Sequence, residues 1–183
     1  MAPWPVVLAS VLQYSTAATF IVMALVAYRF GSAAQEAAEA EVVRQGHSAE
    51  LLIRGRVNFR ETGAELALPL GIALVLIALG TLNLAGYDLA RVTTWVFHAV
   101  LFVGGGYITG AQVFAVRFVQ SVFKRSGDDA LARVDVGGLM EAATSSFPTW
   151  FRMVVALRFA LVTMGSVVLV ILLILPSASG HFR

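Results

Sequence analysis

The chain has 183 residues, of which 58% are hydrophobic and 13% are charged, and its formal net charge is +2. Its mean hydropathy of +0.81 is higher than a soluble domain of this size requires, so a membrane protein is predicted. The absence of cysteine excludes a disulfide framework, a thiolate metal site and a cysteine nucleophile. The basic residues flank apolar runs instead of forming a stripe on a soluble surface, so no binding of nucleic acid is expected.

Four long apolar runs are predicted to cross a membrane as helices, because about 20 apolar residues span a bilayer. The predicted spans cover approximately residues 6–28, 64–87, 92–117 and 152–175. The first run could be mistaken for a signal peptide, but no basic residue precedes Arg29 and the run is too long. We therefore expect an all-α integral membrane protein, with residues 1–183 forming a single four-helix transmembrane domain.

Ten of the thirteen basic residues lie in the two long connections, which follow spans one and three. The positive-inside rule predicts that both connections are cytoplasmic and that both termini lie outside. Interfacial aromatic residues agree, with Trp4, Tyr87 and Trp95 at the predicted outer ends and Tyr28 and Trp150 at the inner ends. The abundance of arginine, alanine, valine and glycine indicates a GC-rich genome and thus a bacterial inner membrane.

Both long connections contain patterns that predict short helices. Ser32-Ala-Ala-Gln35 is a capping-box pattern before a separate helix that Gly46 would end, and Thr62-Gly-Ala-Glu65 is a second one before span two. In the other connection, Ser126-Gly-Asp-Asp129 would cap a helix that Gly137-Gly138 breaks or bends. Two interpretations stay open: amphipathic helices on the membrane surface, or a docking surface for a partner.

Short similarities between the two halves suggest two tandem helical hairpins. Span one ends in Ala27-Tyr-Arg-Phe30 and span three in Ala115-Val-Arg-Phe118, and each long connection closes with Phe-Arg, at Phe59 and Phe151. A duplicated hairpin would show such matches. Arginine and aromatic residues are also common at cytoplasmic interfaces in unrelated membrane proteins, so the alternative of no duplication stays open.

Span three contains a stripe of polar and small residues at spacings of three or four, which predicts that this helix is the most enclosed by protein. The stripe consists of Thr94, His98, Gly105, Thr109 and Gln112. A titratable group inside a membrane is a candidate for a proton relay or a ligand contact. The structural alternative, which we favour, is a hydrogen bond from His98 to Asn83 at a similar depth in span two.

Arg158 is the only charged residue in the apolar run Met153–Leu175 of span four. Near the end of a span, an arginine can extend its guanidinium to water, and we favour this interpretation. The alternative is an ion pair with Glu65 or Glu61 at the cytoplasmic start of span two. Either arrangement would be structural.

Glycines in span three offer a packing site. Gly106-xxx-Gly110 has the small-xxx-small spacing that lets helices approach closely. These glycines lie in an apolar helix without a P-loop lysine, so a phosphate loop is excluded. The sequence also shows no nucleophile elbow, zinc-protease motif, paired intramembrane carboxylates or dinucleotide fingerprint. We therefore predict no catalytic residue, no cofactor and no metal.

Three functions remain. The favoured one is a non-catalytic accessory or assembly subunit of a larger membrane complex, such as a respiratory-chain or transporter complex, whose partners are other membrane subunits and lipids. The second is a small oligomeric transporter or channel component that uses His98, Gln112 and Arg158, although transport pathways usually contain more intramembrane polar residues. The third is a membrane enzyme, for which the sequence offers no acid–base pair or nucleophile.

Overall fold

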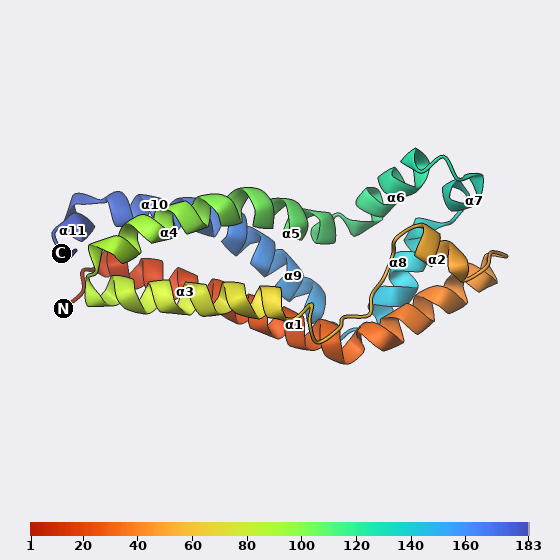
Figure 1. The fold of residues 1–183 in the computed structure, drawn as a ribbon, viewed down its shortest axis with the longest axis horizontal. Helices are drawn as coiled ribbons and strands as arrows, with labels where there is room; N and C mark the ends of the chain where they lie inside the picture. Colours follow the sequence, from red (N-terminus) through yellow and green to blue (C-terminus); the bar gives the residue numbers. More distant parts are fainter. Residues whose placement is uncertain (183) are drawn as a thin grey trace. The chain divides into compact units, whose positions relative to one another are not determined.

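The computed structural model describes residues 1–182, and every regular element in them is a helix (Figure 1). Four helices are long and apolar enough to cross a membrane, which confirms the predicted class of a multi-pass transmembrane protein. They are α1 (Trp4–Arg44), α3 (Ala67–Ala85), the helix Asp88–Val113 and the helix Phe151–Ile174.

The third and fourth spans are each interrupted by one turn of π-helix. The third consists of α4 (Asp88–Val100), the π-helix η1 (Leu101–Gly105) and α5 (Gly106–Val113). The fourth consists of α9 (Phe151–Ala160), the π-helix η2 (Leu161–Gly165) and α10 (Ser166–Ile174). The short helices are α2 (Glu50–Arg54), α6 (Ala115–Arg125), α7 (Asp129–Ala132), α8 (Val136–Ser145) and α11 (Pro176–Ser179).

The chain divides into two compact units. The first, which we call the bundle unit, comprises Met1–Met23, Ala67–Val113 and Met153–Arg183, and contains about the first half of α1 and nearly all of the other three spans. The second, the loop unit, comprises Ala24–Leu66 and Phe114–Arg152, the two basic connections. Helix α1 begins in the bundle unit and ends in the loop unit.

The bundle unit is held together by two apolar clusters that connect all four spans. In one cluster, Val6 and Ala9 of α1 pack with Leu169 and Leu173 of α10. In the other, α1 and α3 pack with the two π-helical segments through Ala17, Phe20, Ala73, Leu76, Leu101 and Val162. The first half of α1 and α3 lie side by side (Figure 1).

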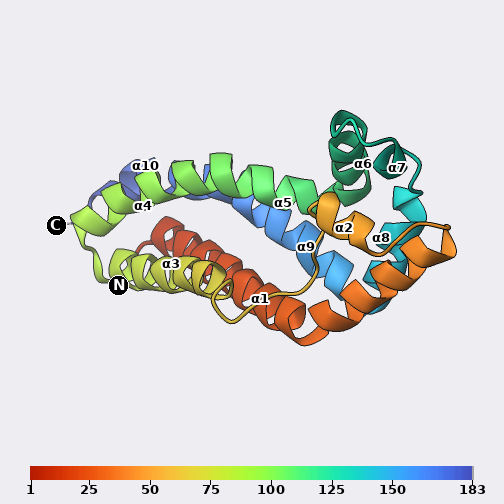
Figure 2. The same cartoon turned by 45° about the vertical axis from the view of Figure 1, so that its right-hand side comes forward.

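The loop unit has an apolar core of its own. The last third of α1 contributes Ala38 and Val42, against which Leu52 of α2, Phe123 of α6 and Leu139 of α8 are buried. Figure 2 shows α2 and α8 beside this end of α1. The two connections thus fold together as one helical module.

Helix α1 extends well beyond the predicted C-terminal end of span one. We expected span one to end near Tyr28 and a separate helix to begin after Ser32, yet α1 continues without a break to Arg44. The Ser32 pattern is therefore not a cap, and the side chain of Gln35 instead accepts a hydrogen bond from the backbone N–H of Phe59 at 2.9 Å. Gly46 does follow the end of the helix, in the left-handed conformation with φ +84°.

The other predicted helix ends are partly correct. The hydrogen bonds of the Thr62 and Glu65 capping box are present, because each side chain accepts from the other residue's backbone N–H, at 2.6 and 3.4 Å, but α3 begins only at Ala67. Between α6 and α8, however, Asp128 and Asp135 are the N-caps, and Gly137 lies inside the first turn of α8. The predicted break therefore lies earlier, where the Asp135 carboxylate offers the backbone an alternative acceptor. The third span also ends earlier, at Val113.

Candidate functional site

The first polar cluster of the bundle unit joins three helices. Asn83 of α3 donates through Nδ2 to Thr94 Oγ1 of α4 at 2.9 Å and to Gln13 Oε1 of α1 at 3.2 Å. All three side chains are fully buried. Asn83 Oδ1 has no hydrogen-bond partner within residues 1–182. The cluster fixes the relative depths of three spans, because a shift of any one would leave buried polar groups unpaired.

His98 is buried and forms a hydrogen bond with the fourth span. Its Nδ1 shares a hydrogen bond of 3.0 Å with Ser166 Oγ at the start of α10. The expected partner was Asn83, which is instead occupied by Gln13 and Thr94. His98 Nε2 is buried without a partner in the described part of the chain.

Arg158 does not reach water as we had expected. Its side chain is 6% exposed, and its Nη2 donates to Gln112 Oε1 of α5. The guanidinium also lies over the ring of Phe20 of α1, 5.3 Å from the centroid. The only carboxylate side chain in the sequence of the bundle unit, Asp88, pairs with Arg91 at 2.7 Å. Arg158 therefore has an amide and a ring as neighbours, but no countercharge in its own unit.

The two proposed acidic partners of Arg158 belong to the loop unit. The Glu65 carboxylate accepts a hydrogen bond from the backbone N–H of Thr62. This bond lowers the pKa of Glu65 most, and a hydrogen bond with the Thr62 side chain lowers it further. Burial, and then the nearby charge of Glu65, raises the pKa of Glu61. Hydrogen bonds with Thr62, burial and the charge of Glu65 thus account for the pKa shifts of the two carboxylates.

The two π-helical segments lie against each other between these polar sites. A Cβ at Gly105 of η1 would lie 3.1 Å from Val162 Cγ1 of η2, so the two backbones approach closely there. Ser166 directly follows η2, and Arg158 lies three residues before it. π-Helical turns are uncommon and frequently occur at functional sites, where the wider turn changes the direction of the flanking side chains.

The small residues of span three face the fourth span, and Thr109 bonds within its own helix. Buried Thr109 donates to the Gly105 carbonyl at 2.8 Å. A Cβ at Gly106 would lie 3.4 Å from Thr163, and one at Gly110 3.5 Å from Phe159, so both glycines face the fourth span. Gln112 is exposed at the end of α5. The small residues thus bring spans three and four together.

The expectation that span three is the most enclosed helix is wrong. Only 17% of its most apolar stretch is buried, compared with 50% for α1. One face carries the polar stripe, whereas large apolar side chains such as Val96, Val100 and Val103 are exposed on the rest. The surface of span three is therefore available to lipid or to another protein.

The first half of α1 has a polar face that was not predicted from the sequence. Ser10, Gln13, Thr16 and Thr19 are all buried, and Ser10 donates to the Gly80 carbonyl at 3.0 Å. Their regular three-residue spacing was a signal that these side chains share one helix face. The uncharged first run concealed it, because hydropathy averages over all faces.

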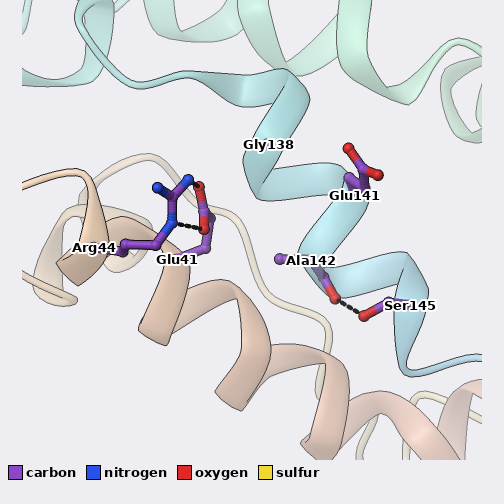
Figure 3. Close-up of a pocket in the computed structure, with 6 residues that line it drawn as sticks. All are labelled: Glu41, Arg44, Gly138, Glu141, Ala142 and Ser145. Atoms are coloured by element: carbon purple, nitrogen blue, oxygen red, sulfur yellow. Dashed lines mark hydrogen bonds and ion pairs between the residues drawn. The ribbon is translucent and has the colours of Figure 1, made fainter.

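The loop unit contains an acidic depression of about 290 Å³ between α1 and α8 (Figure 3). Glu41 lies at its edge and is held by Arg44, whose Nη2 is 2.6 Å from Glu41 Oε1. Gly138 faces this carboxylate, since a Cβ there would lie 3.0 Å from Glu41 Oε1. Arg44 and Gln45 donate hydrogen bonds to both oxygens of Glu41. This carboxylate is therefore already engaged within α1 and its C-terminal end, and we assign no ligand to the depression.

Comparisons of the chain with known protein families, curated proteins and solved structures found no match. Within residues 1–182, no three histidine, aspartate or glutamate side chains gather where they could hold a metal ion. The chemistry of the bundle unit therefore centres on Arg158 with Gln112 and on His98 with Ser166.

Proposed function

We propose that this chain is a non-catalytic accessory or assembly subunit of a larger complex in a bacterial inner membrane. The observation that carries the proposal is the Arg158 site: a buried cation whose partners are neutral, in a unit whose sequence has no carboxylate left for it. An arginine within a span costs about 2.5–3.5 kcal/mol on insertion scales. A carboxylate on a partner's transmembrane helix would offset that cost.

The surroundings of Arg158 support a partner on the side of span three. Gln112, which bonds Arg158, is exposed at the end of α5 and so links the buried cation to the surface. Span three is the least buried of the four spans and has an apolar outer surface. A second helix could pack there by van der Waals contact and place an acidic side chain beside Gln112.

The proposal is tested by native purification from membranes in a mild detergent, with identification of the co-purifying subunits. Arg158→Gln should still insert and fold but should lose most of the co-purifying partner. Arg152→Gln is the matched control, because Arg152 lies on the same helix, is exposed and donates a hydrogen bond to Thr144 Oγ1. Equal recovery of partners with both variants would remove the Arg158 argument, and robust turnover by the purified chain alone would refute the subunit proposal.

The proposed orientation places both termini outside and the loop unit in the cytoplasm. It is supported by the ten basic residues in the two connections. Because the chain has no cysteine, a single cysteine at Ser48 can be labelled selectively. An impermeant reagent added to intact cells should leave it unlabelled, and labelling would contradict this orientation.

A transporter or channel component remains the second candidate. The observation that favours it is the series of buried polar sites within the bundle unit, from Gln13 and Asn83 through His98 to Arg158. Reconstitution in proteoliposomes decides between the two functions. Substrate or ion flux that is lost in His98→Gln would favour the transporter.

A further inference from the structure

A second pocket in the loop unit is basic. It measures about 320 Å³, and three arginines surround it: Arg54, Arg56 and Arg125. Arg54 ends α2, Arg125 ends α6, and Phe123 forms part of the apolar floor. Gly55 permits the close approach, because a Cβ there would lie 2.6 Å from the Phe123 ring. Residues from both basic connections thus converge on one concave surface.

The three arginines differ in how they are held. Arg54 Nη1 lies 2.8 Å from Asp128 Oδ2, and the other oxygen of that carboxylate accepts the Ala130 N–H. Asp128 is therefore engaged on both oxygens and fixes the position of Arg54. Arg56 and Arg125 are exposed and have no carboxylate within ion-pair distance in the described part of the chain. The pocket consequently has an excess of positive charge.

Arg56 has an unusual backbone conformation for its residue type. Its φ of 55° is the only positive value at a non-glycine position within residues 1–182. It follows α2 in a Schellman motif, in which the Val57 N–H bonds the Leu52 carbonyl at 2.9 Å and the Arg56 N–H bonds the Ile53 carbonyl at 3.1 Å. Glycine is usual at this position because a Cβ is strained there. A residue kept in a strained conformation is a reason to look for function in its side chain.

We propose that this pocket binds the phosphate of an anionic phospholipid headgroup. Guanidinium groups bind phosphate oxygens through charge-assisted hydrogen bonds, and three of them line this site. Large apolar side chains are exposed beside the arginines: Ile53 of α2 is 77% exposed and Val122 of α6 is 39% exposed. Together they match a lipid, which presents a phosphate next to acyl chains, better than a soluble phosphate. The inference is independent of the partner proposed for Arg158.

The test uses the full chain in neutral detergent micelles. The Glu50→Cys variant, labelled with an environment-sensitive dye one helical turn before Arg54 on α2, reports occupancy during titration with short-chain phosphatidylglycerol. We expect saturation with this lipid, no response to the phosphatidylcholine of equal chain length, and no response to glycerol phosphate at the same concentrations. Equal responses to both lipids would overturn the anion site, and an equal response to glycerol phosphate would overturn the lipid assignment.

Two variants test the residues. Loss of a charge-assisted hydrogen bond from a guanidinium to the phosphate weakens binding about tenfold or more, so Arg125→Gln should raise the half-saturating lipid concentration roughly tenfold. Arg56→Gly should do the same while raising the melting temperature, because glycine relieves the strained φ. Opposite effects on binding and stability cannot arise from a purely structural role of Arg56. Unchanged binding in either variant would overturn the proposal.

Lys124→Gln is the matched control, since Lys124 lies next to Arg125 on α6 and outside the pocket. It removes the same charge and should change the half-saturating concentration less than twofold. A loss equal to that of Arg125→Gln would show general attraction of the lipid to a basic surface, and would overturn the pocket.

Discussion

The bundle unit buries many polar side chains beside its apolar clusters and exposes an apolar outer surface, whereas the loop unit buries a mainly apolar core and carries its ion pairs at the surface. Gln13, Asn83 and His98 are buried in the bundle while Leu74 and Ile171 are exposed. In the loop unit the buried side chains are apolar except for Gln35, and its ion pairs lie at the surface. Lipid removes the hydrophobic gain from helix association, so the bundle depends on hydrogen bonds and close packing. The loop unit gains from burying apolar surface in water.

The largest expected difference comes from truncating a fully buried leucine in each unit. Leu139→Ala in the loop unit should cost about 2–5 kcal/mol, because both transfer from water and a cavity contribute. Leu76→Ala in the bundle should cost less, because only lost packing remains. Hydrogen exchange of amides in each unit measures the two losses. An equal or greater loss at Leu76 would contradict the contrast.

A glycine on α1 tests how tightly the loop unit is packed. A Cβ at Gly31 would lie 2.2 Å from the backbone oxygen of Phe59, so one of the two segments must move. Gly31→Ala should destabilise the loop unit by about 1–3 kcal/mol, as overpacking generally does. Gly63→Ala is the control, because nothing lies within 4 Å of its Cβ position. Thermal unfolding should separate the two, and equal melting temperatures would show that the contact yields without cost.

The corresponding test in the bundle unit is the bond between His98 and Ser166. His98→Leu should cost about 0.6–1.7 kcal/mol, the range of hydrogen bonds within membranes. His98→Asn should cost less, because its amide lies where Nδ1 bonds Ser166. Adding Ser166→Ala to His98→Leu should cost little more, since the bond is already lost. Fully additive losses in a denaturant titration would show that the two residues are not coupled.

The smallest expected effect is a pH dependence at Glu61. Burial and the Glu65 charge raise its pKa, so the folded state prefers the protonated carboxyl. Its favourable contribution is present below the ordinary pKa of 4.5 and is lost as pH rises through the raised value. Glu61→Gln should therefore raise the melting temperature slightly at pH 7 and leave it unchanged at pH 4. The opposite order of the two shifts would contradict the assignment.

The four spans could be predicted because hydropathy and charge depend on the sequence alone. The boundary after Tyr28 could not, because a serine followed by glutamine three residues later also fits the middle of a helix. Gln35 does not take part in a cap because its side chain accepts a hydrogen bond from the backbone N–H of Phe59, 24 residues away in the sequence. Local patterns cannot reveal such a distant partner.

The residues of the candidate site could be selected from the sequence, but their hydrogen-bond partners could not. The stripe on span three included His98, which is buried, yet no spacing pattern in span four indicated that its partner is Ser166. The π-helical turns were not predicted, because an extra residue in a turn leaves hydropathy unchanged. Those turns set which residues of spans three and four face each other, and therefore which polar groups meet.

The π-helical turns also bear on how the sequence can change in length. A π-helical turn accommodates about one residue more than an α-helical turn, so it is what a single-residue insertion produces in a packed helix. Gly104 lies in such a turn, and its Cβ position faces open space. Removing one residue there would return η1 to regular α-helix. The residues of α4 and α5 on either side would keep the helix faces that they now present. Span three thus has a site where deletion should be tolerated far better than elsewhere in the span.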